Sequence, residues 1–263
     1  MTHDQLRNIY NPDGSPLRAH QLRLLSMLKK IDAYCKQHNI RYTLSSGTVL
    51  GAVRHKGFVP WDDDIDIELT ASQFRKFRNL IKKHPIEGLQ WQDWKNDPAY
   101  VQPFAKLRDA AHHIHEEDSF DHLYKYHGPY IDIFILYPSN SLRLARLATH
   151  VQNLLQYRPQ ALPDTPRKII LPIAKALTHG AIYPFLRFIS AIGAGKTLRH
   201  TPGTAYLKPR HRDDIFHTST ALFEDAILPI PANPHRYLTQ IYGDYSRLPD
   251  ADSLPKHLDT KKL

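Results

Sequence analysis

The stretch YTLSSGTVLGAVRHKGFVPWDDDIDIEL, residues 42–69, decides the fold of this 263-residue chain. It opens with a short strand pattern over 42–47 that ends in a glycine turn, and the spacing that follows predicts a helix over 48–54. Its last residues, 64–69, alternate polar and apolar side chains, which is the period of a strand. A strand, a glycine turn and a helix start in this order form a unit that often holds phosphate.

Two acids of this stretch are candidate metal ligands. Asp64 and Asp66 lie two residues apart in the predicted strand, so their side chains share one face while Ile65 and Ile67 face the core. Two carboxylates on one face can share a hard cation such as Mg²⁺ or Mn²⁺, which prefers oxygen ligands. The alternative interpretation is that residues 62–64 form a solvated acidic loop.

A third acid, Asp132, lies at the centre of a strongly apolar strand predicted over 130–137. If this strand lies beside that of Asp64 and Asp66, the three carboxylates converge on a metal pair. One metal could hold a diphosphate or triphosphate, and the other could lower the pKa of an attacking hydroxyl. These three acids are therefore the candidate catalytic residues. A structural aspartate bonded to backbone amides is the alternative for Asp132.

The glycine turn is a candidate phosphate site, because N–H groups at the start of a helix can bind an anion. Gly47 precedes Asp64 by 17 residues, close enough to present a phosphate to a metal held there. The candidate substrate-binding residues of the turn and of neighbouring basic segments are Ser46, Gly47, Thr48, Arg54, His55, Lys106 and Arg108. For each basic residue alone, a solvated surface position is the alternative.

The net charge of +9 is unevenly distributed along the chain. Residues 141–212 carry 12 Lys and Arg but one Asp or Glu, whereas residues 1–140 are nearly neutral at +1 and residues 213–263 carry −3. We therefore predict three regions: a catalytic core, a basic helical region and a C-terminal segment that packs back on the core. Lysine, histidine, arginine and two prolines interrupt the apolar stretch 169–192, which favours an interfacial or buried helix over a membrane span.

Several classes of protein are disfavoured. One cysteine, Cys35, allows no internal disulfide, and the N-terminus lacks the apolar segment of a secretory signal, so we expect a cytoplasmic location. The basic region lacks the aromatic and glycine-rich organisation of a single-strand platform, so we expect no nucleic-acid partner. The histidines and glutamate of 112–116 could ligate zinc, but without further ligands they are typical of a polar surface strand.

Residues 42–69 resemble the signature of the LicD family, which belongs to the nucleotidyltransferase superfamily and includes the fukutin-related glycan phosphotransferases. The resemblance continues in AKLRD at 105–109, GPYIDIF at 128–134 and PANPHRYLTQIYGDYSRLPD at 231–250. It implies an α+β fold, with a nucleotidyltransferase-like mixed sheet, flanking helices and a helical C-terminal portion.

The resemblance also implies roles for individual residues. The glycine turn at Ser46 and Gly47 would hold donor phosphates, Asp64 and Asp66 would bind divalent metals, and Asp132 would complete the site. Similar family members transfer phosphocholine from CDP-choline to a sugar hydroxyl of a cell-surface glycan precursor. The implied chemistry is attack of the acceptor hydroxyl on a metal-bound diphosphate, with departure of CMP.

The resemblance makes a CDP-linked donor and a glycan or lipid-linked glycan acceptor the expected partners. The quaternary ammonium of choline favours aromatic faces, and Trp61 beside the acidic run is the best candidate, a core aromatic being its alternative. The basic region predicts peripheral contact with the anionic inner face of the plasma membrane, or capture of an anionic acceptor. Transfer of another polyol phosphate or a nucleotidyl group, and a non-catalytic polyanion-binding protein, are the alternative functions.

Overall fold

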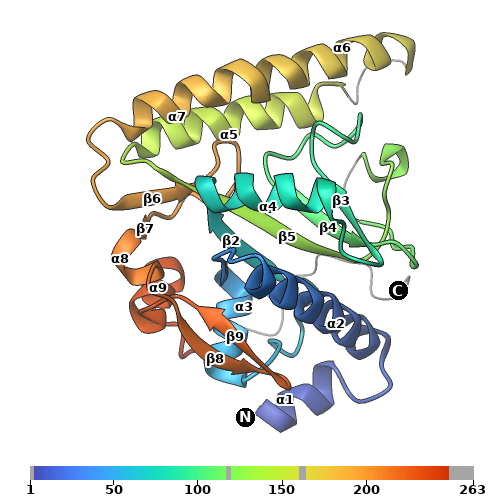
Figure 1. The fold of residues 1–263 in the computed structure, drawn as a ribbon, viewed down its shortest axis with the longest axis vertical. Helices are drawn as coiled ribbons and strands as arrows, with labels where there is room; N and C mark the ends of the chain where they lie inside the picture. Colours follow the sequence, from blue (N-terminus) through green and yellow to red (C-terminus); the bar gives the residue numbers. More distant parts are fainter. Residues whose placement is uncertain (1–2, 117–119, 160–163, 249–263) are drawn as a thin grey trace.

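The computed structural model describes residues 3–116, 120–159 and 164–248. Within these ranges the chain forms a mixed seven-stranded sheet, flanking helices and a separate two-stranded hairpin (Figure 1). The predicted α+β class is therefore confirmed.

The sheet places the two acidic strands next to each other. Its main path runs in the order β1 (Thr43–Leu44), β2 (Asp66–Thr70), β5 (Tyr130–Pro138), β4 (Ala105–Asp109) and β3 (Leu89–Gln92). β2 and β5 are parallel, and the other neighbours on this path are antiparallel. β6 (Thr197–His200) pairs with the far end of β5 and with β7 (Arg210–His211), so the basic region adds two strands that its sequence pattern did not predict.

One face of the sheet carries the hydrophobic core. Alternate residues of the central strands, such as Ile67 and Ile133, are fully buried and belong to the same apolar cluster as residues of α2 (Pro16–Gln37) and α4 (Ala71–Lys83). Both helices have side-chain N-caps: Ser15 and Thr70 accept hydrogen bonds from backbone N–H groups of the first turn. The opposite face of the sheet is left for polar side chains.

The glycine turn leads into a short helix, as predicted. α3 (Ser46–Leu50) continues directly into a π-helical turn, η1 (Gly51–His55). Two further short elements, α1 (His3–Tyr10) and the 3₁₀ turn η2 (Asp121–Leu123), lie outside the sheet. The predicted strand over 112–116 is wrong: residues 112–115 form no strand, and the Glu116 side chain forms ion pairs with Lys106 and Arg108 of β4.

The basic region forms a helical layer along one edge of the molecule, at the top of Figure 1. It consists of α5 (Leu142–Tyr157), α6 (Asp164–Leu177), the π-helical turn η4 (Thr178–Ile182) and α7 (Tyr183–Ala191). The last three elements form one continuous run, and Pro166–Ala191 is long and apolar enough to cross a membrane. A single helix of this kind is weak evidence for a span.

The described part of the C-terminal segment packs against the core. It contains α8 (Arg212–Ile215), the hairpin of β8 (Ser219–Phe223) and β9 (Ala226–Ile230), and α9 (Pro234–Tyr242). Phe223, Leu228 and Tyr237 belong to the same apolar cluster as Ile67 of β2. Residues 249–263 of this segment, and residues 117–119 and 160–163 of the other two regions, lie outside the described residues, and the three-region division stays a prediction.

Candidate active site

The polar face of the sheet aligns two acids and a lysine in one row. Asp66 of β2 is the direct partner of Asp132 of β5, and Asp132 is in turn the partner of Lys106 of β4. Because side chains alternate along each strand, all three project from the face opposite to the isoleucine core. The expected adjacency of the two acidic strands is confirmed.

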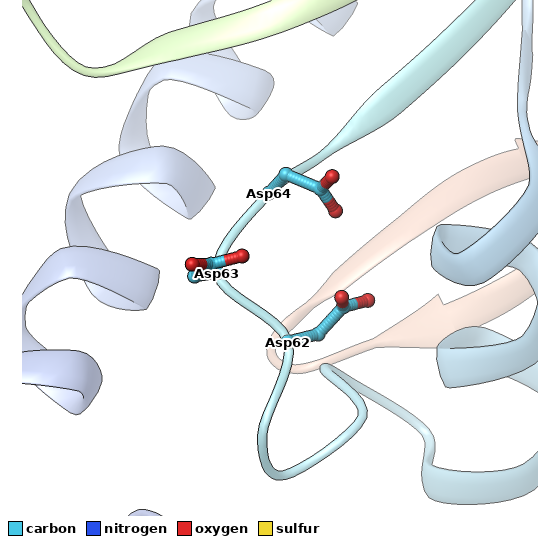
Figure 2. A group of neighbouring side chains, drawn as sticks. All are labelled: Asp62, Asp63 and Asp64. Carbon is cyan, nitrogen blue, oxygen red and sulfur yellow. The ribbon is translucent and has the colours of Figure 1, made fainter. Parts of the chain in front are cut away.

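Two further carboxylates reach this row from the loop that leads into β2. β2 begins only at Asp66, so Asp64 lies just before the strand rather than inside it. Figure 2 shows the carboxylates of Asp62 and Asp64 on the same side of the loop, and oxygens of Asp62, Asp63 and Asp64 lie within 4.8 Å of one another. Asp62, Asp64 and Asp66 line a cavity of about 500 Å³, whereas Asp63 is absent from its described lining.

Burial and mutual repulsion raise the pKa of these acids. Burial and then the charge of Asp64 raise the pKa of both Asp62 and Asp66 well above the usual range. Burial also raises the pKa of Asp132 to about 7, although Lys106 opposes this shift. The crowding of carboxylates therefore leaves an excess of negative charge that a cation would neutralise.

The donor set fits a hard divalent cation. Asp132 Oδ1 is buried without a hydrogen-bond partner among the described residues, and it lies 3.8 Å from Lys106 Nζ. Every candidate ligand is a carboxylate oxygen, the type that Mg²⁺ and Mn²⁺ prefer.

The turn at Ser46 is held in place from behind. Ser46 has a left-handed backbone with φ 44°, and its N–H donates to the Tyr237 hydroxyl at 3.1 Å. Its hydroxyl accepts a hydrogen bond of 3.2 Å from the Arg210 guanidinium. The turn is therefore fixed by residues that follow it by more than 160 positions.

Thr48 and Gly47 connect this turn to the acids. Thr48 Oγ1 accepts a hydrogen bond of 2.9 Å from the backbone N–H of Asp66. A Cβ atom at Gly47 would lie 3.2 Å from Asp62 Oδ2, so the lack of a side chain lets the turn approach the carboxylate closely. Ser46 and Gly47 line the cavity. Thr48 is not part of the described lining, but its hydrogen bond positions the start of β2.

A buried ionic network behind the cavity was not predicted. Glu68 Oε2 lies 3.0 Å from His200 Nε2 and 3.1 Å from Arg210 Nε, and Ser45 donates a further hydrogen bond to it. Burial opposes ionisation of Glu68, but Arg210 and His200 outweigh it and lower its pKa. Glu68 continues the alternation of Asp64 and Asp66, and this pattern could have identified it. Its partners His200 and Arg210 are too distant in sequence for any local pattern to indicate them.

The predicted basic residues divide into two groups. Arg54 lines the cavity and donates to the backbone oxygen of Tyr245 at 3.0 Å, and its Nε donates to His55 at 2.8 Å. Lys106 lies behind the lining, paired with Glu116 and near Asp132. Arg108 is fully buried.

The contacts of Arg108 give it a structural position. Its guanidinium donates to Gln92 Oε1 at 2.6 Å and to the Gly128 carbonyl at 2.9 Å, and it forms an ion pair with Glu116. These contacts hold β3, β4 and the loop before β5 together, and the described cavity lining does not include Arg108.

Aromatic side chains surround the part of the cavity beside the acids. Trp61, the predicted candidate, lines it together with Tyr206, Tyr242 and Tyr245. The charge of Asp66 is the largest of the influences that raise the pKa of Tyr206, followed by burial. Tyr206 and Tyr242 were not predicted: Tyr206 lies in a loop without a pattern, and Tyr242, although within the 231–250 stretch, ends a helix where nothing marks it as a binding residue.

Comparison with known proteins supports the family resemblance. The model of the LicD/FKTN/FKRP nucleotidyltransferase domain matches residues 39–185, which include all the acids discussed above. The lipopolysaccharide cholinephosphotransferase LicD of Haemophilus influenzae is 26% identical over 258 residues, covering 92% of this chain and 96% of that protein. An uncharacterized protein of Rickettsia typhi is 31% identical over 102 residues, covering 39% of this chain and 32% of that protein.

The family match covers more than half of the chain and includes the glycine turn, the acidic loop and the strand of Asp132. The expectation that the chain is a transferase is confirmed by this match and by the cholinephosphotransferase, which aligns over nearly its whole length. The chain therefore belongs to the LicD/FKTN/FKRP family of nucleotidyltransferase domains.

Proposed function

We propose that this protein transfers phosphocholine from CDP-choline to a hydroxyl of lipopolysaccharide or a related cell-surface glycan, in a reaction that requires a divalent metal ion. The observation that carries the proposal is the pairing of Asp66 with Asp132 beside a cavity lined by Asp62 and Asp64. Similarity to a lipopolysaccharide cholinephosphotransferase supports the phosphocholine group and the acceptor.

Asp64, Asp66 and Asp132 would hold Mg²⁺ or Mn²⁺, and Asp62 would support them through its contact with Asp64. When bound, the cation supplies neutralisation of the donor diphosphate and of the departing CMP. The surplus of buried negative charge makes this group of acids suited to a cation and unsuited to binding phosphate without one.

The other cavity residues would orient the donor. The turn at Ser46 and Gly47 lies at the cavity wall beside the acids, where the donor phosphates would bind. The Arg54 side chain, anchored by Tyr245, would offer its positive charge to the diphosphate. The aromatic lining of Trp61 and Tyr206 would receive the quaternary ammonium of choline.

The transfer itself exchanges one phosphorus–oxygen bond for another. The acceptor hydroxyl oxygen forms a bond to the choline-bearing phosphorus, and the bond from this phosphorus to the bridging oxygen breaks, so that CMP leaves. Asp132 is placed either to accept the hydroxyl proton or to complete the ligand set of the metal.

A panel of donors tests the proposal. The purified protein would be incubated with Mg²⁺, lipopolysaccharide and CDP-choline, CDP-ribitol or CDP-glycerol, with CMP release as the readout. We expect CMP from CDP-choline and labelled choline on the acceptor. Release from CDP-ribitol or CDP-glycerol alone would assign the chain to transfer of another polyol phosphate. No release from any donor would contradict the proposed reaction.

A further inference from the structure

The helical run α6–η4–α7 exposes several large apolar side chains, whereas its Lys175 and His179 are buried. Six large residues spaced three to eight apart are each between 57% and 72% exposed: Ile169, Ile173, Leu177, Phe185, Phe188 and Ile192. Helical spacing places such residues along one side of the run. We call these six residues the α6–α7 ridge.

Lys175 and His179 of the same run point into the protein. Lys175 Nζ donates to the backbone oxygens of Asp97 and Pro98 at 2.8 and 2.7 Å. His179 Nε2 donates to the Val101 oxygen at 2.9 Å, and its ring stacks on Trp94. The helix is therefore fixed to the 94–101 loop through its polar side, which leaves its apolar side outward.

α5 secures the second half of the run. The Tyr183 hydroxyl donates to Gln152 Oε1 at 2.8 Å, and Leu186 packs with Ala148 in a small buried cluster. In Figure 1 the run forms the outermost layer of the molecule, above α5. Within the described part of the chain, the ridge is thus a continuous apolar surface facing solvent, a feature typical of an interaction site.

The charges near the ridge indicate its partner. Lys168 lies next to Ile169 in the run, and Arg143, Arg146 and Arg158 are exposed at α5 or its end. Residues 141–212 carry a net charge of +11, and although Lys175 and Arg210 of this set are buried, Lys168, Arg143, Arg146 and Arg158 are exposed. A surface that combines exposed aliphatic and aromatic side chains with lysine and arginine fits the interface of an anionic bilayer.

We propose that the α6–α7 ridge lies in the plane of an anionic membrane surface, with Ile173, Phe188 and their neighbours inserted below the lipid head groups. A transmembrane orientation would break the bonds of Lys175 and His179 and place both polar groups in hydrocarbon. A second copy of the chain would bring a second strongly basic surface against the first. This inference goes beyond the proposed catalytic function and does not depend on it.

Vesicle co-sedimentation tests the partner. We expect the full chain to bind phosphatidylglycerol vesicles and to bind phosphatidylcholine vesicles much more weakly, with binding reduced by salt. The double substitution Ile173→Gln/Phe188→Gln should lower the partition coefficient by at least about tenfold. The matched control Ile9→Gln/Ile227→Gln, at positions of 60% and 58% exposure on other elements, should bind as the unmodified protein does.

A depth measurement tests the orientation. Cys35 is buried and its pKa is raised to about 12, first by burial, so a cysteine introduced at position 173 or 188 can be labelled selectively with an environment-sensitive fluorophore. The two positions lie about 22 Å apart along a helix. If the ridge lies in the plane of the membrane, quenching by lipid-bound quenchers should place both labels at the same shallow depth. A label at position 9 should remain in water.

Several results would overturn the proposal. Equal binding of neutral and anionic vesicles would show that the positive charges do not drive binding. Unequal depths of the two labels would indicate a transmembrane helix. A lipid-free dimer that the ridge substitutions dissociate, without vesicle binding, would identify a second copy as the partner. Circular dichroism and thermal melting of each variant would show that these exposed substitutions leave the fold intact.

Discussion

Asp66 and Asp132 are direct partners on two adjacent parallel strands, although 66 positions separate them in the sequence. This pairing exists because each acid interrupts an isoleucine-rich strand, and the two isoleucine faces pack on the same core. The core thus determines the register, and the register brings the carboxylates together. The catalytic proposal depends on this relationship.

Divalent metal ions should stabilise the protein. Neutralising the repulsion among Asp62, Asp64 and Asp66 favours the folded state, and a ligand at about 100 times its Kd adds about 2.7 kcal/mol. We expect Mg²⁺ to raise the melting temperature in calorimetry relative to EDTA, and Asp66→Asn to lose this increment. Identical melting temperatures of the unmodified protein with Mg²⁺ and EDTA would argue against a metal at these acids.

Arg210 should be essential for stability. It is buried against Glu68 and Tyr237, so Arg210→Met leaves the buried Glu68 carboxylate without this positively charged partner. Breaking such a pair costs about 3–5 kcal/mol. Urea denaturation should show this loss, whereas Arg212→Met, an exposed neighbour, should change the unfolding free energy by less than about 0.5 kcal/mol.

A double substitution separates charge from packing at this site. Glu68→Gln combined with Arg210→Met removes both charges. We expect the double variant to have a higher free energy of unfolding than Arg210→Met alone. Strictly additive losses would show that the two side chains do not interact energetically.

The aromatic lining should select the donor head group. Tyr206→Leu and Trp61→Leu keep an apolar side chain and remove the aromatic face that a quaternary ammonium would contact. We expect each to raise KM for CDP-choline about fivefold or more, as the loss of about 1 kcal/mol requires. The inhibition constant of CMP, which has no choline group, should change little, and a parallel rise in it would instead indicate general damage to the cavity.

Acid should weaken the attachment of the α6–η4–α7 run. Burial is the main reason that the pKa of His179 is lowered to about 4, whereas the unfolded chain has the ordinary value near 6.5. Well above pH 6.5 the His179 side chain is neutral in both the folded and the unfolded state. As the pH falls from 6.5 toward 4 the unfolded state binds the proton first, so stability decreases by up to about 1.4 kcal/mol per pH unit.

Denaturation across this pH range checks the role of His179. His179→Gln cannot bind a proton, so its stability deficit relative to the unmodified protein should shrink as the pH falls. Parallel pH dependences of the two proteins would show that His179 does not titrate with unfolding.

The sequence allowed prediction of the elements that local pattern determines. The short helix after the glycine turn and the strand near 130–137 are present because spacing and end signals agree there. The grouping of Asp64, Asp66 and Asp132 could also be predicted, since carboxylates in apolar strands need a partner. All of these signals lie within a few residues of the feature that they predict.

The remaining features depend on contacts between distant segments. His200 and Arg210 meet Glu68 only after β6 and β7 join the sheet, and no local pattern marks that pairing. Residues 112–116 have strand-like composition, but residues 112–115 form no strand, and Glu116 forms ion pairs with Lys106 and Arg108, which no local pattern marks. The 94–101 loop likewise gains its role only by accepting the bonds of Lys175 and His179.

The most direct test of the central claim is transfer of radiolabelled phosphocholine from CDP-choline to lipopolysaccharide, measured with Mg²⁺ and with EDTA. We predict transfer with stoichiometric CMP release in Mg²⁺, none in EDTA, and a loss of at least about 100-fold in kcat for Asp66→Asn. Asp225→Asn, an exposed acid on the β8–β9 turn, should be fully active. Undiminished transfer in EDTA or by Asp66→Asn would contradict the account.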